Sequence, residues 1–188
     1  MGQWEYWSAM KNSPSSTNLS AKKSLTVGYH VPDDPALLAA LGEISITHGH
    51  LDHILKMMLL TFTGVRPQEA MDATAGESSW SLRNQVRKAA ETKLGVDIPT
   101  LVRVKALLGR CSRITKRRNA LIHILCGQDQ DGNAVAATED LQIWNPFPTV
   151  PDLNKLSGDM QKLIDELMKA RGLGGFITHA LMADKKPT

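Results

Sequence analysis

An unbroken helical pattern between positions 37 and 62 constrains the fold of this chain more than any other feature. Its apolar side chains recur three or four residues apart, with one step of seven where His48 stands between positions 44 and 51, at positions 37, 41, 44, 51, 55, 58 and 62. This spacing places them on one face of an α-helix. Asp34 and Pro35 precede the pattern as an N-cap and a first-turn proline. Gly64 and Pro67 follow it and are typical of a helix end.

The rest of the chain carries the same spacing in further segments. Helices are predicted at 78–94, from Pro99 to about Gly127 and at 153–171, with a short final turn at 176–181. After the third long helix, turn residues around Asp131 and two short β-prone runs predict a small β-hairpin-like loop. Short joints between the helices predict an all-α fold, an antiparallel four- to five-helix bundle.

The glycines and cysteines of these helices lead to two further predictions. Gly42 and Gly49 lie on nearly the same helix face, where glycine costs helix stability, so a close helix–helix approach is expected. Cys111 and Cys126 are about four turns apart in one predicted helix, beyond the reach of a disulfide. Both cysteines are therefore expected to be reduced and packed.

Length and charge set broader limits. With 188 residues, of which 42% are hydrophobic, the chain is expected to form one domain. We expect a flexible extension at 1–34, a helical domain at 35–183 and a tail at 184–188. The net charge of +3 permits contact with nucleic acid without demonstrating it. No signal-peptide pattern and no run of about 18 apolar residues occurs, so we expect a cytoplasmic protein without a membrane partner.

A histidine-rich sequence inside the first helix matches the letters of a zinc motif. The motif belongs to the metallo-β-lactamase fold, and its residues here are His48, His50, Asp52 and His53. Candidates for the remaining ligands, at separations that such hydrolases use, are His123, Asp140 and His179.

Helical geometry argues against a zinc site at this motif. At about 100° per residue, His48 and Asp52 share one helix face. His50 and His53 point elsewhere, and four ligands spread around a helix cannot converge on one tetrahedral ion. We therefore expect no metal or other cofactor, with His48 partly buried and the other two histidines in solvent. The zinc hydrolase is kept as the disfavoured alternative.

The third long helix carries a cation on its apolar face. The apolar positions 101, 104, 108 and 111, continued forward, lead to positions 115 and 118 and thus to Arg118. A guanidinium there needs a partner, a wet cleft or an interface, because burial of an unpaired charge is costly. Asp52 or Glu43 would serve as that partner in a purely structural interpretation. Asn119 and His123 are four residues apart and therefore adjacent on the helix surface.

The combination Arg118-Asn119 and then His123, late in a long helix, resembles the signature of the HEPN superfamily. The resemblance covers about residues 35–172, although only this motif is specific. It implies an antiparallel helical bundle that dimerises and brings two such motifs into one cleft. It also implies a metal-independent endoribonuclease of a toxin–antitoxin or antiphage-defence system, which would act on RNA.

The resemblance assigns a role to each residue of the motif. His123 would act as general base or acid on the RNA 2′-hydroxyl or the leaving group. Arg118 would stabilise charge on the phosphate, and Asn119 would orient His123 or the phosphate. Nearby cations would hold the RNA backbone, and these are Lys116, Arg117, Arg113 and Arg110.

The expected partners are therefore RNA, a second copy of the chain and a neutralising protein, with no cofactor. The main alternative is a non-catalytic dimer that binds RNA, a nucleotide or a protein through the same cleft. The fold alone would not separate these functions, since catalysis depends on the site.

Overall fold

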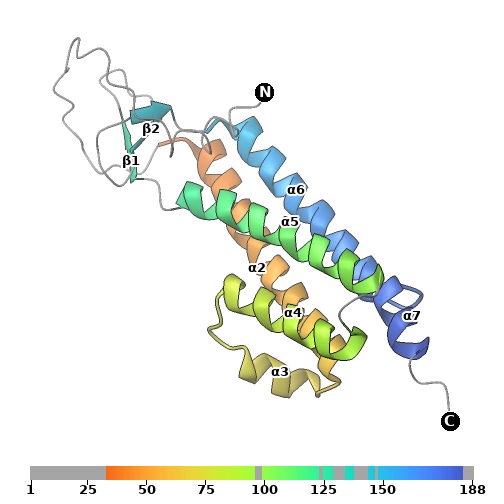
Figure 1. Cartoon of the computed structure of the whole chain (residues 1–188). Helices are drawn as coiled ribbons and strands as arrows, with labels where there is room; N and C mark the ends of the chain where they lie inside the picture. The colour runs from red at the N-terminus through yellow and green to blue at the C-terminus, as the bar shows by residue number, and fades with distance from the viewer. Residues whose placement is uncertain are drawn as a thin grey trace, which may run out of the picture.

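The computed structural model describes residues 33–95, 99–122, 125–128, 134–137, 144–146 and 148–183. Its helices are α2 (Pro35–Thr63), α3 (Pro67–Ala73), α4 (Ser79–Leu94), α5 (Pro99–Ile122), α6 (Val150–Arg171) and α7 (Phe176–Ala183). Its strands are β1 (Leu125–Gln128), β2 (Ala134–Ala137) and β3 (Trp144–Pro146). The predicted helical bundle is confirmed, and Figure 1 shows α2, α5 and α6 as its long elements.

The ends of the helices follow from local capping. Asp34 caps α2 by accepting hydrogen bonds from the backbone amides of Ala36 and Leu37, at 2.9 and 3.1 Å. Gly64 ends α2 in the left-handed conformation, with φ of 71°, and donates its amide proton to the carbonyl of Leu60. Both boundaries agree with the sequence prediction.

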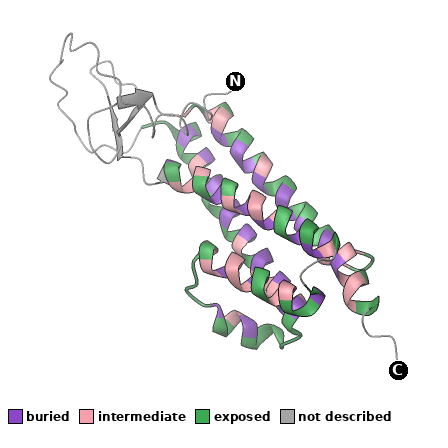
Figure 2. Cartoon of the chain, viewed as in Figure 1, coloured by how far each residue is buried: buried purple, intermediate pink, exposed green. Residues whose placement is uncertain are grey.

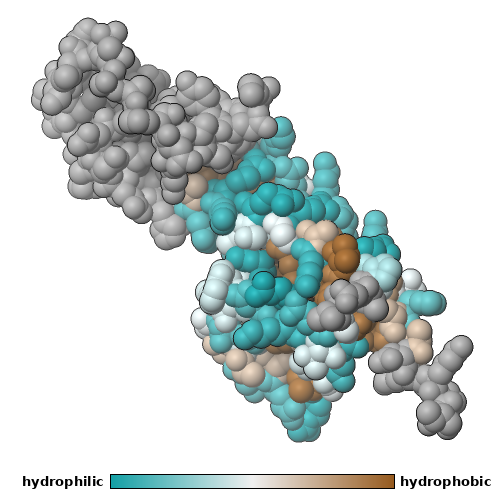
Figure 3. Space-filling view, viewed as in Figure 1, coloured by the Kyte–Doolittle hydropathy of each residue, from teal (hydrophilic) through white to brown (hydrophobic). Residues whose placement is uncertain are grey.

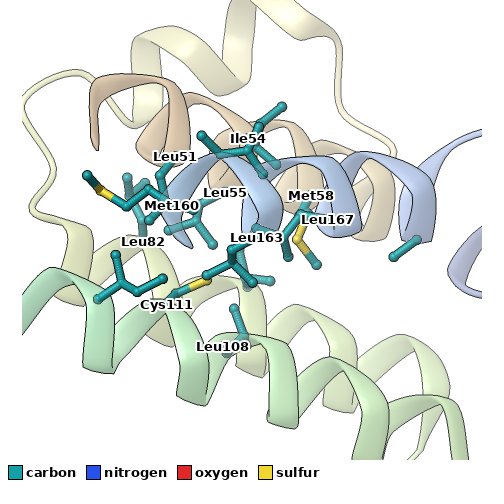
Figure 4. Packing of buried hydrophobic residues seen from close by; sticks show 14 of the residues in the cluster. Leu51, Ile54, Leu55, Met58, Leu82, Leu108, Cys111, Met160, Leu163 and Leu167 are labelled. Atoms are coloured by element: carbon teal, nitrogen blue, oxygen red, sulfur yellow. The ribbon is translucent and has the colours of Figure 1, made fainter. Parts of the chain in front are cut away.

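The core lies between α2, α4, α5 and α6. α2 packs against both α4 and α6, and α5 packs against the same two helices. Buried residues line the inner faces of these helices, as Figure 2 shows. Figure 4 shows the centre of this core, formed by Leu51, Ile54, Leu55, Met58, Leu82, Leu108, Cys111, Met160, Leu163 and Leu167.

The helices do not all alternate in direction. Arg110 and Arg117 of α5 pair with Glu166 and Asp159 of α6, so α5 and α6 are antiparallel. By contrast, α2 and α6 run the same way: contacts with Ser157 occur near the start of both helices, and Arg171 reaches Thr61 near their ends. The antiparallel prediction is therefore wrong for α2 and α6. The described helices α3, α4 and α5 separate them in the chain, so no short loop forces them to alternate.

The end of α5 also differs from the prediction. The helix ends at Ile122, not near Gly127, and Leu125–Gln128 pairs with Ala134–Ala137 as antiparallel strands. Gly127 disfavours helix, and strand pairing satisfies its backbone instead. Within the described residues the strands form one sheet in the order β1-β2-β3. The turn around Asp131 lies outside the described residues.

The two cysteines consequently belong to different elements. Cys111 is a buried free thiol in α5, as predicted, and burial raises its pKa to about 12. It therefore stays protonated and unreactive at neutral pH. Cys126 lies in β1 and not in the helix of Cys111.

The expected close approach at Gly42 and Gly49 is wrong. Both residues are exposed, and a Cβ atom added at either one would have no neighbour within 4 Å. They lie on the side of α2 opposite Ile44 and Leu51, which face the core. Figure 3 shows that the visible surface of the helical body is mainly hydrophilic, with a hydrophobic area near its centre. No helix among the described residues is long and apolar enough to cross a membrane.

Candidate functional site

A chain of polar contacts crosses the interface of α2, α4 and α5. Ser79 donates to Asp52 Oδ1 at 2.6 Å, and Asp52 Oδ2 lies 3.6 Å from His48 Nδ1. His48 Nε2 lies 3.4 Å from Thr115 Oγ1, which accepts a hydrogen bond from Arg83 Nη1 at 3.1 Å. We call these five residues, His48, Asp52, Ser79, Arg83 and Thr115, the polar seam.

His48 is neutral at the centre of this seam. The residue is only 6% exposed, and burial lowers its pKa below the ordinary 6.5. The positive charges of Arg118 and Arg83 lower the pKa further, whereas Asp52 acts in the opposite direction. Since Asp52 faces Nδ1, the proton belongs on Nδ1, and Nε2 accepts the hydroxyl proton of Thr115.

The order Thr115, His48, Asp52 is that of a nucleophile, a base and an orienting acid. The surroundings of Thr115 argue against a role as a nucleophile. Thr115 is only 6% exposed, and its oxygen already accepts a hydrogen bond from Arg83. A substrate therefore has no approach to this hydroxyl, and the seam joins three helices instead of activating a nucleophile.

The burial of His48 predicts how stability changes with pH. Because its pKa is lower in the folded chain, the unfolded chain binds the proton first as the pH falls below 6.5. The contribution of neutral His48 is thus complete above that pH and is lost below it. We expect the wild type to lose free energy of unfolding as the pH falls below about 6.5. His48→Gln, which cannot titrate, should flatten this slope in urea unfolding.

The matched control is His53→Gln, at an exposed position of the same helix. This variant should keep the wild-type slope. Equal slopes for the wild type and both variants would show that His48 does not titrate differently in the folded chain.

The zinc motif separates as the helical geometry predicted. His48 is buried, whereas His50 and His53 are exposed. His179 lies in α7, in a groove of about 810 Å³ between α5, α6 and α7. Asp140 and His123 lie outside the described residues. Among the residues that the structure describes, no group of histidine, cysteine, aspartate or glutamate is placed to hold a metal ion.

Arg118 is half-buried beside the polar seam, in line with the apolar face as predicted. Its Nη1 donates to Asn119 Oδ1 at 3.1 Å, and its charge acts on His48. Its Nε is buried and has no hydrogen-bond partner in the described part of the chain. The structural interpretation, in which Asp52 or Glu43 pairs with Arg118, is not what is found: neither carboxylate forms an ion pair with it.

The four cations predicted to hold an RNA backbone are not equivalent. Arg110 forms a bidentate ion pair with Glu166, with one contact at 2.9 Å. Arg117 pairs with Asp159 at 3.3 Å. The other two predicted cations, Lys116 and Arg113, are exposed. The first two are thus engaged in holding α5 against α6, and the second two are accessible to an anion.

Sequence reasoning missed most of the polar seam. Ser79, Arg83 and Thr115 come from α4 and α5 and meet only through helix packing. Only position 115, a threonine on the apolar stripe, carried a signal. The fold and site therefore define a helical bundle with a buried polar interface and an adjacent half-buried arginine. No protein-family model, curated protein or solved structure matches this chain.

Proposed function

We propose that this chain is a HEPN-like, metal-independent endoribonuclease that uses Arg118, Asn119 and His123. The supporting observation is the state of Arg118: a half-buried guanidinium whose Nε has no partner among the described residues. Arg118 also forms no ion pair with a described residue, so its charge is uncompensated, and a planar guanidinium fits the oxygens of a phosphate.

Local charge also favours an anion at this place. Arg118 and Arg83 both act on His48, and among the described residues Asp52 is the carboxylate that acts on it. Two cations facing one carboxylate leave an excess of positive charge in a partly buried region, where electrostatic interactions are stronger than in water.

The proposed reaction is transesterification. The RNA 2′-oxygen attacks the adjacent phosphorus and the bond to the 5′-oxygen breaks, which leaves a 2′,3′-cyclic phosphate and a 5′-hydroxyl. His123 takes the proton of the 2′-hydroxyl or gives one to the 5′-oxygen. Arg118 stabilises the charge that grows on the phosphate oxygens, and Asn119 orders the Arg118 guanidinium through their hydrogen bond.

The proposal includes a dimer. Arg118 and His123 are five residues apart, a step of about 140° around an α-helix. A helix continued through position 123 would not aim both side chains at the same phosphate, and α5 ends at Ile122, so His123 itself lies outside the described residues. Two copies of the chain, each contributing to a shared cleft, would supply Arg118 and His123 to one site.

A cleavage assay in excess EDTA tests the proposal. Wild type incubated with end-labelled single-stranded RNA should give fragments with cyclic phosphate ends, and His123→Ala should not. His53→Ala is the matched control, because His53 is an exposed histidine outside the proposed site. Absence of cleavage by the wild type on varied RNAs would refute the nuclease. RNA binding that persists without cleavage would favour the non-catalytic binding module.

A further inference from the structure

A groove separate from the proposed catalytic residues lies between α4 and α5. Its volume is about 390 Å³. Two stripes of side chains, each with helical spacing, form its walls: Trp80, Asn84 and Arg87 from α4, and Lys105, Gly109 and Ser112 from α5.

Positive charge dominates the groove. Arg83, Arg87 and Lys105 line it, with Glu91 as the opposing carboxylate. Lys105 Nζ forms an ion pair with Glu91 at 2.9 Å, and the two charges neutralise each other at that end of the groove. Arg87 forms no ion pair with any described residue, and Arg83 donates one hydrogen bond, to Thr115. Besides Lys105, Arg87 also lowers the pKa of Glu91, but three cations against one carboxylate among the lining residues leave the groove positive, with Trp80 and Arg83 at the end away from Glu91.

Trp80 gives this end an unusual chemistry. Its side chain is 70% exposed although indole is among the largest apolar groups. An exposed indole beside cations suits a ligand that has both flat aromatic surfaces and negative charge. Single-stranded nucleic acid has both, because its unpaired bases stack on aromatic rings while its phosphates contact lysine and arginine.

The α5 wall of the groove carries no side chain at Gly109. Glycine inside a helix costs about 1 kcal/mol relative to alanine. Helix packing does not require it here, since an added Cβ would meet only Arg113 Nη1, at 3.9 Å. The absence of a side chain leaves room between the two walls.

We infer that the α4–α5 groove binds single-stranded RNA, with a base stacked on Trp80 and the adjoining phosphates held by Arg87 and Arg83. Duplex RNA does not fit this mode, because its bases are not free to stack on a side chain. The identity of the polymer rests on the proposed function, whereas binding in the groove is measured without cleavage.

The groove is connected to the polar seam through one residue. Arg83 lines the groove and donates to Thr115, whose oxygen contacts His48. A strand held along α4 would thus end beside the region where Arg118 lies. The groove would select single-stranded substrate before any cleavage.

Fluorescence anisotropy of a labelled oligouridine, in EDTA and with His123→Ala as the parent protein, tests this inference. Trp80→Ala should weaken binding by about 5- to 150-fold, and Trp80→Phe should keep most of the affinity. Gly109→Leu should weaken binding by placing a bulky side chain between the two walls. Arg87→Ala should reduce the slope of log affinity against log salt concentration by about one. Lys93→Ala, on the opposite side of α4, should leave this slope unchanged.

Several outcomes would overturn the inference. Affinity unchanged by Trp80→Ala, with circular dichroism showing a folded protein, would exclude stacking. If duplex RNA bound with the same affinity as single-stranded RNA, the ligand would not be held by base stacking. The same would follow if an acidic peptide displaced the labelled oligouridine as effectively as unlabelled RNA does. Loss of a dimer in Trp80→Ala by light scattering would place the indole in a contact between copies. RNA binding that depends on Trp80, without any cleavage by the wild type, would support the groove and refute only the nuclease.

Discussion

Replacing Arg118 by alanine is expected to slow RNA cleavage by roughly 10²- to 10³-fold, the usual cost of removing one donor that stabilises charge in a transition state. The same change should leave the free energy of unfolding unchanged or raise it. The reason is that Arg118 Nε is buried without a partner among the described residues, so folding leaves its desolvation uncompensated. Cleavage rates in EDTA and urea unfolding of the same preparations measure both effects.

Two comparisons separate this role from a simple loss of charge. Lys162→Ala removes an exposed cation from α6 and should affect neither quantity. Arg118→Lys keeps the charge but loses the planar fork, so it should restore only part of the rate. A large loss of stability in Arg118→Ala would contradict the proposal and assign Arg118 to the structural interpretation.

Arg118→Ala should also change the titration of His48. Since the charge of Arg118 lowers the pKa of His48, its removal should raise that pKa toward the ordinary value. Nuclear magnetic resonance of the imidazole protons would follow this change in the absence of RNA. An unchanged pKa would mean that the two side chains do not interact across the α2–α5 contact.

Leu55→Ala is expected to lower the free energy of unfolding by about 3 kcal/mol, within the range for fully buried leucines. Leu55 is 0% exposed, and Figure 4 shows it among the core residues of α2, α4, α5 and α6. The cost combines the lost burial of the side chain with a cavity that four packed helices cannot close. In a chain of this length the melting temperature should fall by roughly 6–12 °C.

Leu38→Ala is the matched control, because this leucine of the same helix is 42% exposed. It should change stability by no more than about 0.5 kcal/mol. If the dependence of the free energy of unfolding on urea concentration is the same in both variants, the difference in stability between them belongs to the folded state. Equal effects of the two substitutions would contradict the placement of Leu55 in the core.

Much of the helical fold could be predicted from local chemistry. The apolar spacing of α2 and its Asp34 cap depend only on neighbouring residues, so the structure agrees with the prediction closely. The end of α5 could not be predicted in this way. Leu125 continues the helical spacing, yet the pairing of β1 with β2 decides its conformation. The short helix α3 was also missed, since it begins directly after the residues that end α2.

The candidate site shows the same limit. The position of Arg118 follows from the period of one helix and was predicted correctly. Its surroundings were not predicted, because Arg83 reaches Thr115 only through the packing of α4 on α5. The groove with Trp80 was likewise not predicted, as exposure of an indole depends on which helix faces are covered.

The parallel arrangement of α2 and α6 bears on how the chain folds during synthesis. Their contacting residues Thr47 and Ser157 are separated by 110 positions in the sequence. At about 5–20 residues per second, a ribosome needs roughly 5–20 s to add the second helix after the first. Throughout that interval the apolar face of α2 lacks the helix that covers it in the finished protein. Until α6 has emerged, α2 of the nascent chain has only α3, α4 and α5 to pack against among the helices that contact it in the finished protein.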